Sequence, residues 1–127
     1  MITEDYCSYE ISKLLKEKGF EGVCDYAYSN KGNYFEIDRS NFDEVYCLRP
    51  THQMAMKWLR EVHKLSIDIC TVQGKGISYM FNIWDFSTIH DNKFIGGMFD
   101  LREQLYDFLT HEEAVEAALK YSLENLI

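Results

Sequence analysis

The sequence lacks the compositional features of fibrous, disordered, membrane-spanning and exported proteins. Only one of its 127 residues is proline, while 46% are hydrophobic and 27% charged, which excludes a collagen-like repeat, a low-complexity linker and a disordered tail. No run approaches the roughly 20 apolar residues of a membrane-spanning helix, because Ser78 and Asn82 interrupt the most apolar run. The first residues are acidic where an export signal would be basic. We therefore expect one soluble, cytoplasmic domain over residues 1–127 that does not bind membranes.

Motifs for catalysis, metal binding and redox chemistry are also missing. No two of the four cysteines form a C-x-x-C pair, so we expect them to be reduced and structural. There is no G-x-S-x-G motif, and Gly74-Lys75-Gly76 lacks the spacing of a phosphate-binding loop. His52 and His63 would lie about 16 Å apart along one helix, too far to share a metal ion. These absences predict a protein that is not an enzyme and has no cofactor.

Basic residues are few and concentrated in one segment. The chain has 13 Lys and Arg against 21 Asp and Glu, a net charge of −8 that makes nucleic acid an unlikely partner. Residues 49–64 alone carry four basic groups and one acidic group. On a helix, four polar side chains of this segment form one stripe: Gln53, Lys57, Arg60 and Lys64. The stripe is either an ordinary solvated face or a docking surface for an acidic protein or a second copy of the chain.

The periodicity predicts an α+β fold with three main helices, in the order αββαββα. The helices are expected from a cap at Thr3 to Gly19, from Pro50 and Thr51 to Leu65, and after a capping box at Thr110. Two hairpins are expected, one over residues 23–37 with its turn at 30–33 and one over residues 66–84 with its turn at 73–76. Together they are expected to form an antiparallel sheet of about four strands in a two-layer arrangement with the helices. Residues 38–50 are expected to be irregular, with an edge strand near Val45. Residues 85–97 are expected to be a loop, and 98–109 a short helix.

The second predicted helix has the clearest apolar face, and Trp58 lies in its middle. We expect Trp58 to be a core residue rather than a binding aromatic. The face is completed by five further side chains: Met54, Ala55, Leu59, Val62 and Leu65. A second aromatic pattern, in residues 75–81, partly matches the strand motif on which RNA-binding sheets stack bases. Two functions can be distinguished by the exposure of five aromatic side chains: Tyr26, Tyr28, Tyr34, Tyr79 and Phe81. If they face solvent, RNA binding by base stacking is favoured, and if they are buried, they form the core face of the strands.

Two segments carry a resemblance to a known group of proteins. Residues 51–68, with the core Lys-Trp-Leu-Arg-Glu-Val-His at 57–63, and the helix at 110–119 resemble small prophage and mobile-element proteins of gut Bacteroidales, a family of unknown function. The resemblance implies a phage-like, accessory-genome origin and transfers no site residue. The sequence thus favours a non-enzymatic interaction or accessory protein. The alternative is a nucleic-acid-associated accessory protein that uses the 49–64 segment or the aromatic strands.

Overall fold

The computed structural model describes residues 2–73, 76–87, 93–95 and 106–127. The chain divides into two compact units, an N-terminal unit, Met1–Ala55, and a C-terminal unit, Met56–Ile127. The boundary falls within helix α2 (His52–His63), which begins in one unit and ends in the other. The single domain expected from the chain length stays a prediction. Every helix in the described ranges is too short or too polar to cross a membrane.

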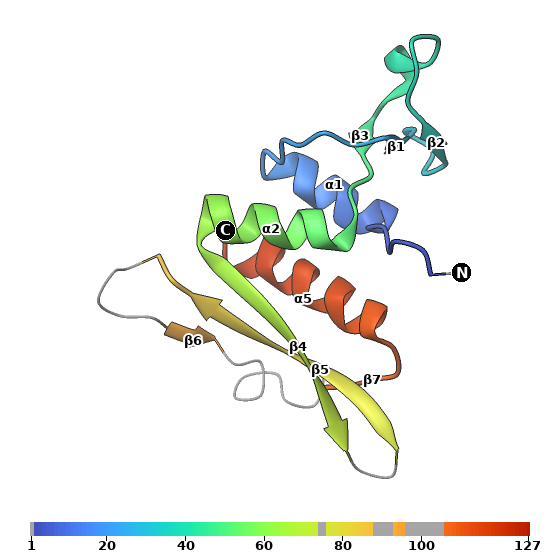
Figure 1. The fold of residues 1–127 in the computed structure, drawn as a ribbon. Coiled ribbons are helices and arrows are strands. Elements are labelled where there is room, and N and C mark those ends of the chain that lie inside the picture. Colours follow the sequence, from blue (N-terminus) through green and yellow to red (C-terminus); the bar gives the residue numbers. More distant parts are fainter. Residues whose placement is uncertain (1, 74–75, 88–92, 96–105) are drawn as a thin grey trace. The chain divides into compact units, whose positions relative to one another are not determined.

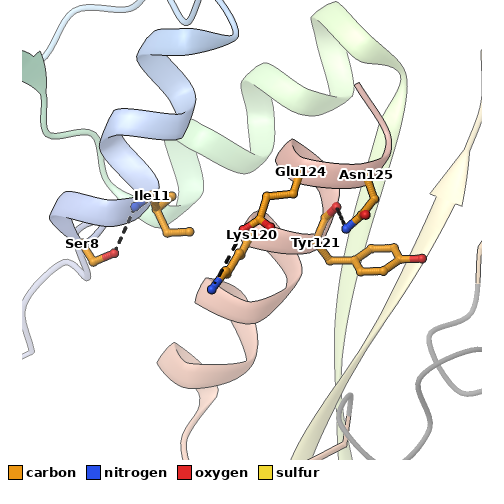
Figure 2. A network of polar contacts seen from close by, with 6 residues as sticks. All are labelled: Ser8, Ile11, Lys120, Tyr121, Glu124 and Asn125. Atoms are coloured by element: carbon orange, nitrogen blue, oxygen red, sulfur yellow. Dashed lines mark hydrogen bonds and ion pairs between the residues drawn. The ribbon is translucent and has the colours of Figure 1, made fainter.

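Helix α1 (Tyr9–Glu17) starts later than the sequence predicted. Its N-cap is Ser8, whose Oγ accepts a hydrogen bond from the backbone N–H of Ile11 (Figure 2). The expected cap at Thr3 is wrong, because residues 5–7 are extended and their backbone pairs with residues 50–52. The helix ends as predicted, with Gly19 at φ +85° and the N–H of Phe20 donating to the Leu15 carbonyl in a Schellman motif.

The N-terminal unit contains a small antiparallel sheet in the strand order β2-β1-β3. Strands β1 (Tyr26–Tyr28) and β2 (Tyr34–Glu36) form the first predicted hairpin. The edge strand expected near Val45 is β3 (Cys47–Leu48), which follows a single 3-10 turn, η1 (Phe42–Glu44), and pairs with β1. Helix α1 packs against β3.

Helix α2 begins where the sequence predicted and ends two residues early. The Thr51 hydroxyl accepts a hydrogen bond from the Met54 N–H at its start. Lys64 has a positive φ of 58°, which stops the helix so that Leu65 begins the next strand. Trp58 is buried, with 9% of its surface exposed, as expected of a core residue. Val62, predicted to be buried, is 57% exposed because it lies in the last turn.

The C-terminal unit is built on a long hairpin of β4 (Leu65–Gln73) and β5 (Ile77–Asp85) (Figure 1). Two short strands also pair with β5: β6 (Lys93–Ile95) and β7 (Tyr106–Phe108). The predicted 85–97 loop therefore contains a strand. Most of the predicted 98–109 helix lies outside the described residues, and its last part is β7 instead, because the alternation Tyr-Asp-Phe suits an edge strand.

Helix α5 (His111–Asn125) covers one face of this hairpin, so the C-terminal unit has a two-layer arrangement. Its predicted cap is confirmed, since the Thr110 hydroxyl accepts a hydrogen bond from the Glu113 N–H. Figure 2 shows two further contacts along α5, the ion pair of Lys120 with Glu124 and the hydrogen bond from the Asn125 amide to the Tyr121 carbonyl. Six residues of this helix are buried: Ala114, Val115, Ala118, Leu119, Ser122 and Leu123.

The fold class predicted from the sequence is thus confirmed in outline. The chain is α+β, with three helices and antiparallel hairpins in the described ranges. The single sheet of about four strands is not found. The two hairpins belong to separate sheets, because β3 completes the first sheet within the N-terminal unit and β6 and β7 extend the second.

Candidate binding surface

The predicted basic stripe is exposed along its whole length. All four side chains are exposed: Gln53, Lys57, Arg60 and Lys64. Lys57 forms an ion pair with Glu61 at 4.0 Å, and the Lys64 ammonium donates to the Glu61 carbonyl at 3.0 Å. Both partners of the ion pair are about two-thirds exposed, so the pair contributes at most about 1 kcal/mol. The stripe is therefore available to a partner, but one carboxylate already offsets part of its charge.

A denser arrangement of aromatic and cationic groups surrounds Arg49 in the N-terminal unit. The guanidinium carbon lies 4.3 Å from the ring centre of Tyr6 and 4.0 Å from that of Tyr34. It lies 5.8 and 5.7 Å from the rings of Tyr26 and Tyr28. Each of these distances is within the range of a cation–π interaction. We call these five residues the Arg49 cluster.

The sheet explains why these side chains meet. Tyr26 and Tyr28 are two residues apart on β1 and so point to the same face, and Tyr34 lies opposite Tyr28 in the β1–β2 register. The Arg49 N–H donates to the Tyr26 carbonyl at 2.9 Å, which places this residue beside β1 just after β3 ends. Tyr6 joins them through the bridge of its backbone with Thr51.

The Tyr28 hydroxyl links Arg49 to the backbone of the N-terminal segment by hydrogen bonds. It donates to the Cys7 carbonyl at 2.7 Å and accepts from Arg49 Nε at 3.2 Å. Tyr28 is 7% exposed, whereas Tyr34 is 60% exposed. The four terminal N–H groups of the Arg49 guanidinium make no hydrogen bond within the described part of the chain. The cluster therefore presents a positioned cation with unused donors beside an exposed tyrosine.

A second group of tyrosines and cations continues from Tyr28 along α1. The Tyr9 ring lies 5.4 Å from that of Tyr28 and 6.2 Å from that of Tyr46. Lys13 lies over the Tyr9 ring at 4.8 Å, and Lys16 over the Tyr46 ring at 4.0 Å. Tyr9 also packs on Gly32, whose φ of +87° any side chain would strain, and where a Cβ atom would approach the ring to 3.1 Å.

The aromatic strand of the C-terminal unit, in contrast, is covered. Phe81 is fully buried, with its ring centre 6.2 Å from Phe108 and 6.4 Å from Tyr121 of α5. Tyr79 is half-buried and contacts His111 at the start of the same helix. Base stacking on these two side chains would require α5 to leave the sheet, so the burial pattern indicates a strand core.

Two of the four cysteines, Cys24 and Cys47, are poorly suited to act as nucleophiles. All four cysteines are free thiols, as predicted, and their structural role stays a prediction. Burial, assisted by the neighbouring Asp25 carboxylate, raises the pKa of Cys24 to about 11. Burial also raises the pKa of Cys47, although the charges of Lys16 and Lys13 oppose the shift. Because the thiolate is the reactive form, both side chains are weak nucleophiles at neutral pH.

Comparison of the chain with protein-family models, with curated proteins and with solved structures found no match. The case for function therefore depends on the geometry. Sequence reasoning identified the stripe on α2 but missed the Arg49 cluster. A signal was present, because six of the nine tyrosines lie in the first 46 residues and two of them alternate at 26 and 28. The position of Arg49 beside them depends on β3, which the sequence placed only approximately.

Proposed function

We propose that the protein is a non-enzymatic interaction protein that binds an acidic segment of a partner protein through the Arg49 cluster. The observation that carries this proposal is the state of the Arg49 side chain. Its guanidinium carbon lies over the Tyr6 and Tyr34 rings and its Nε donates to the Tyr28 hydroxyl, while its terminal N–H groups make no hydrogen bond within the described residues. A guanidinium fixed in this way loses little conformational entropy when it binds a carboxylate with two parallel hydrogen bonds.

The composition of the cluster also favours a protein ligand. Tyrosine and arginine are enriched among the side chains that contribute most to the affinity of protein interfaces. Tyr34 offers exposed apolar area next to the cation, and its ring has few rotamers to lose on binding. Together these groups suit a partner residue with a carboxylate followed by an apolar side chain. The exposed stripe at Lys57, Arg60 and Lys64 would attract the same acidic partner by charge and increase the association rate.

We further infer that the protein serves a phage or mobile element as a cytoplasmic accessory protein. This part of the proposal is supported only by the resemblance of residues 51–68 and 110–119 to small proteins of such elements. The partner could then be another protein of the same element or a second copy of this acidic chain.

The test compares two arginine variants in a pull-down of tagged protein from its native host, followed by titration of the purified partner. In Arg49→Lys the charge is kept and the planar donor pair is lost, so affinity should fall at least tenfold. Arg39→Lys is the matched control, because Arg39 is exposed in the same unit and its side chain makes no hydrogen bond, ion pair or ring contact with the described residues. Circular dichroism of both variants checks that the fold is kept. Equal affinity of the two variants would contradict the proposal.

A charge-reversal variant separates the two surfaces. Replacing Lys57, Arg60 and Lys64 together with glutamate should slow association, most at low salt, and leave the dissociation rate nearly unchanged. Fluorescence anisotropy with single-stranded RNA tests the alternative nucleic-acid function. RNA binding that Arg49→Lys abolishes would replace the protein partner with a nucleic acid.

A further inference from the structure

Strand β4 forms a long open edge of the sheet in the C-terminal unit. It has nine residues and pairs with β5 along its whole length without a register shift. Its outer edge pairs with no other strand in the described ranges, since β6 and β7 both pair with β5. The other edge strands of these ranges, β2, β3, β6 and β7, have at most three residues each. The edge at β4 is therefore much longer than these others.

The backbone groups along this edge have no partner among the described residues. In an antiparallel strand, every second residue directs its N–H and C=O away from the neighbour with which it pairs. On β4 these outward groups make no hydrogen bond with the described part of the chain. Proteins usually protect such an edge with a short strand, lysine, proline or a bulge, because an open edge pairs with strands of other chains. The sequence of β4 contains no lysine, proline or glycine, and Asp68 is its single charged residue.

The two faces of β4 impose different demands on an added strand. Ile69 lies opposite Phe81, whose ring contacts α5, so the odd-numbered residues are on the face that the helix covers. On this face Ile67 is buried, whereas Ile69 is half-buried. The even-numbered face carries Asp68, which is exposed, and Cys70, which is half-buried. An added strand must therefore present apolar residues on one face and avoid a second carboxylate on the other.

A second copy of β4 meets these demands in one register. Two antiparallel strands related by a two-fold axis keep their helix-covered faces on the same side only when the axis passes through a residue position. An axis at Ile69 pairs all nine residues of one copy with nine of the other. It places Ile69 opposite itself and Asp68 opposite Cys70 of the second copy, so no like charges meet. An axis at Asp68 would instead bring two carboxylates together, which destabilises the pairing.

We propose that the protein forms a two-fold dimer in which β4 pairs antiparallel with β4 of a second copy, with the axis at Ile69. The pairing gives hydrogen-bond partners to the outward backbone groups of both strands, and it covers the exposed part of Ile69 with another β-branched side chain. The sheets of the two C-terminal units then form one continuous sheet. The interface does not involve the Arg49 cluster, so it stands independently of the proposed function.

Analytical ultracentrifugation of the purified full chain, from micromolar to millimolar concentration, measures the association. We expect a reversible equilibrium between monomer and dimer, and a monomer at every concentration, or growth beyond the dimer, would overturn the proposal. Hydrogen exchange at both ends of this range locates the interface. The outward amides of β4 should exchange at least tenfold more slowly in the dimer, whereas those of β2, an edge strand of the N-terminal unit, should not change. Protection of β2 instead of β4 would also contradict the proposal.

A charge series at position 70 tests the register. Cys70→Asp places a carboxylate opposite Asp68 of the second copy, whereas Cys70→Lys places an ammonium there, and the two-fold axis repeats each pair. The Kd of the Cys70→Asp dimer should therefore be at least tenfold higher than that of the Cys70→Lys dimer at low salt. Adding Asp68→Lys to Cys70→Asp restores opposite charges across the axis and should restore the affinity. Equal Kd values for these three variants, each shown by circular dichroism to be folded, would contradict the register.

The variant Arg49→Lys separates this dimer from the partner contact of the proposed function. Arg49 lies in the N-terminal unit and β4 in the C-terminal unit, so the Kd of the dimer should stay within about twofold of that of the original protein. Loss of the dimer in Arg49→Lys would assign self-association to the Arg49 cluster and would contradict pairing at β4. Loss of the partner with an unchanged dimer supports both contacts.

Discussion

Replacing Tyr28 with phenylalanine tests the internal support of the Arg49 cluster. The substitution keeps the ring, which is 7% exposed, and removes only the hydroxyl. That hydroxyl donates to the Cys7 carbonyl at 2.7 Å and accepts a hydrogen bond from Arg49 Nε at 3.2 Å. A neutral hydrogen bond contributes about 1 kcal/mol and one to a charged group about 1.5–3 kcal/mol. Because Arg49 is only half-buried and water can replace part of its bond, we expect a net loss of about 2 kcal/mol.

The assay is urea denaturation followed by circular dichroism, with hydrogen exchange to locate the effect. Faster exchange should be confined to the N-terminal unit, at β1 and β3. The matched control is Tyr34→Phe, since the Tyr34 ring also contacts Arg49 but its hydroxyl makes no hydrogen bond within the described residues. The free energy of unfolding of this control should stay within about 0.5 kcal/mol of that of the original protein. Equal destabilisation by both substitutions would refute the role assigned to the Tyr28 hydroxyl.

Three further outcomes follow from burial, capping and ionisation. Trp58→Ala should lower the free energy of unfolding by about 3–5 kcal/mol, because the side chain is buried. Urea denaturation measures this, and an unchanged midpoint would contradict it. Thr110→Ala removes the cap of α5 and should cost about 1 kcal/mol, measured the same way, whereas loss of an exposed side chain alone would cost nearly nothing. Burial raises the pKa of Cys24 from 9.0 to about 11, so the unfolded chain ionises first and stability should fall as the pH rises between these values. Cys24→Ala should show a smaller decline over that range in denaturation at each pH.

Local signals in the sequence predicted most of the elements. The Gly19 stop, the turn at 30–33, the Thr51 and Thr110 caps and the long second hairpin all appear where short-range chemistry placed them. Each depends on residues within a few positions of one another. The start of α1 was wrong because long-range pairing of residues 5–7 with 50–52 holds that segment extended, and no local pattern reports such pairing.

The candidate sites also differ in whether local sequence patterns could predict them. The stripe predicted on α2 follows from helical spacing alone, and the structure places its four side chains at the surface, with Lys64 just after the last helical residue, His63. The Arg49 cluster joins residues 6, 26, 28, 34 and 49, which only the strand register brings together. The sequence predicted that the two hairpins share one sheet, whereas they belong to separate sheets. Alternation of apolar residues indicates that strands exist but does not indicate which strands pair.

The most direct test of the central claim is site-specific photo-crosslinking at the Arg49 cluster. Tyr34 is replaced with p-benzoylphenylalanine, which keeps an aromatic ring at an exposed position beside the guanidinium. The control carries the same replacement at Phe42, which is 70% exposed in the same unit but has no contact with Arg49. After irradiation in the native host, mass spectrometry should find one protein attached at position 34, at a peptide rich in acidic residues, and absent at position 42. The same adducts from both positions, or nucleic acid at position 34, would contradict an acidic protein partner at Arg49.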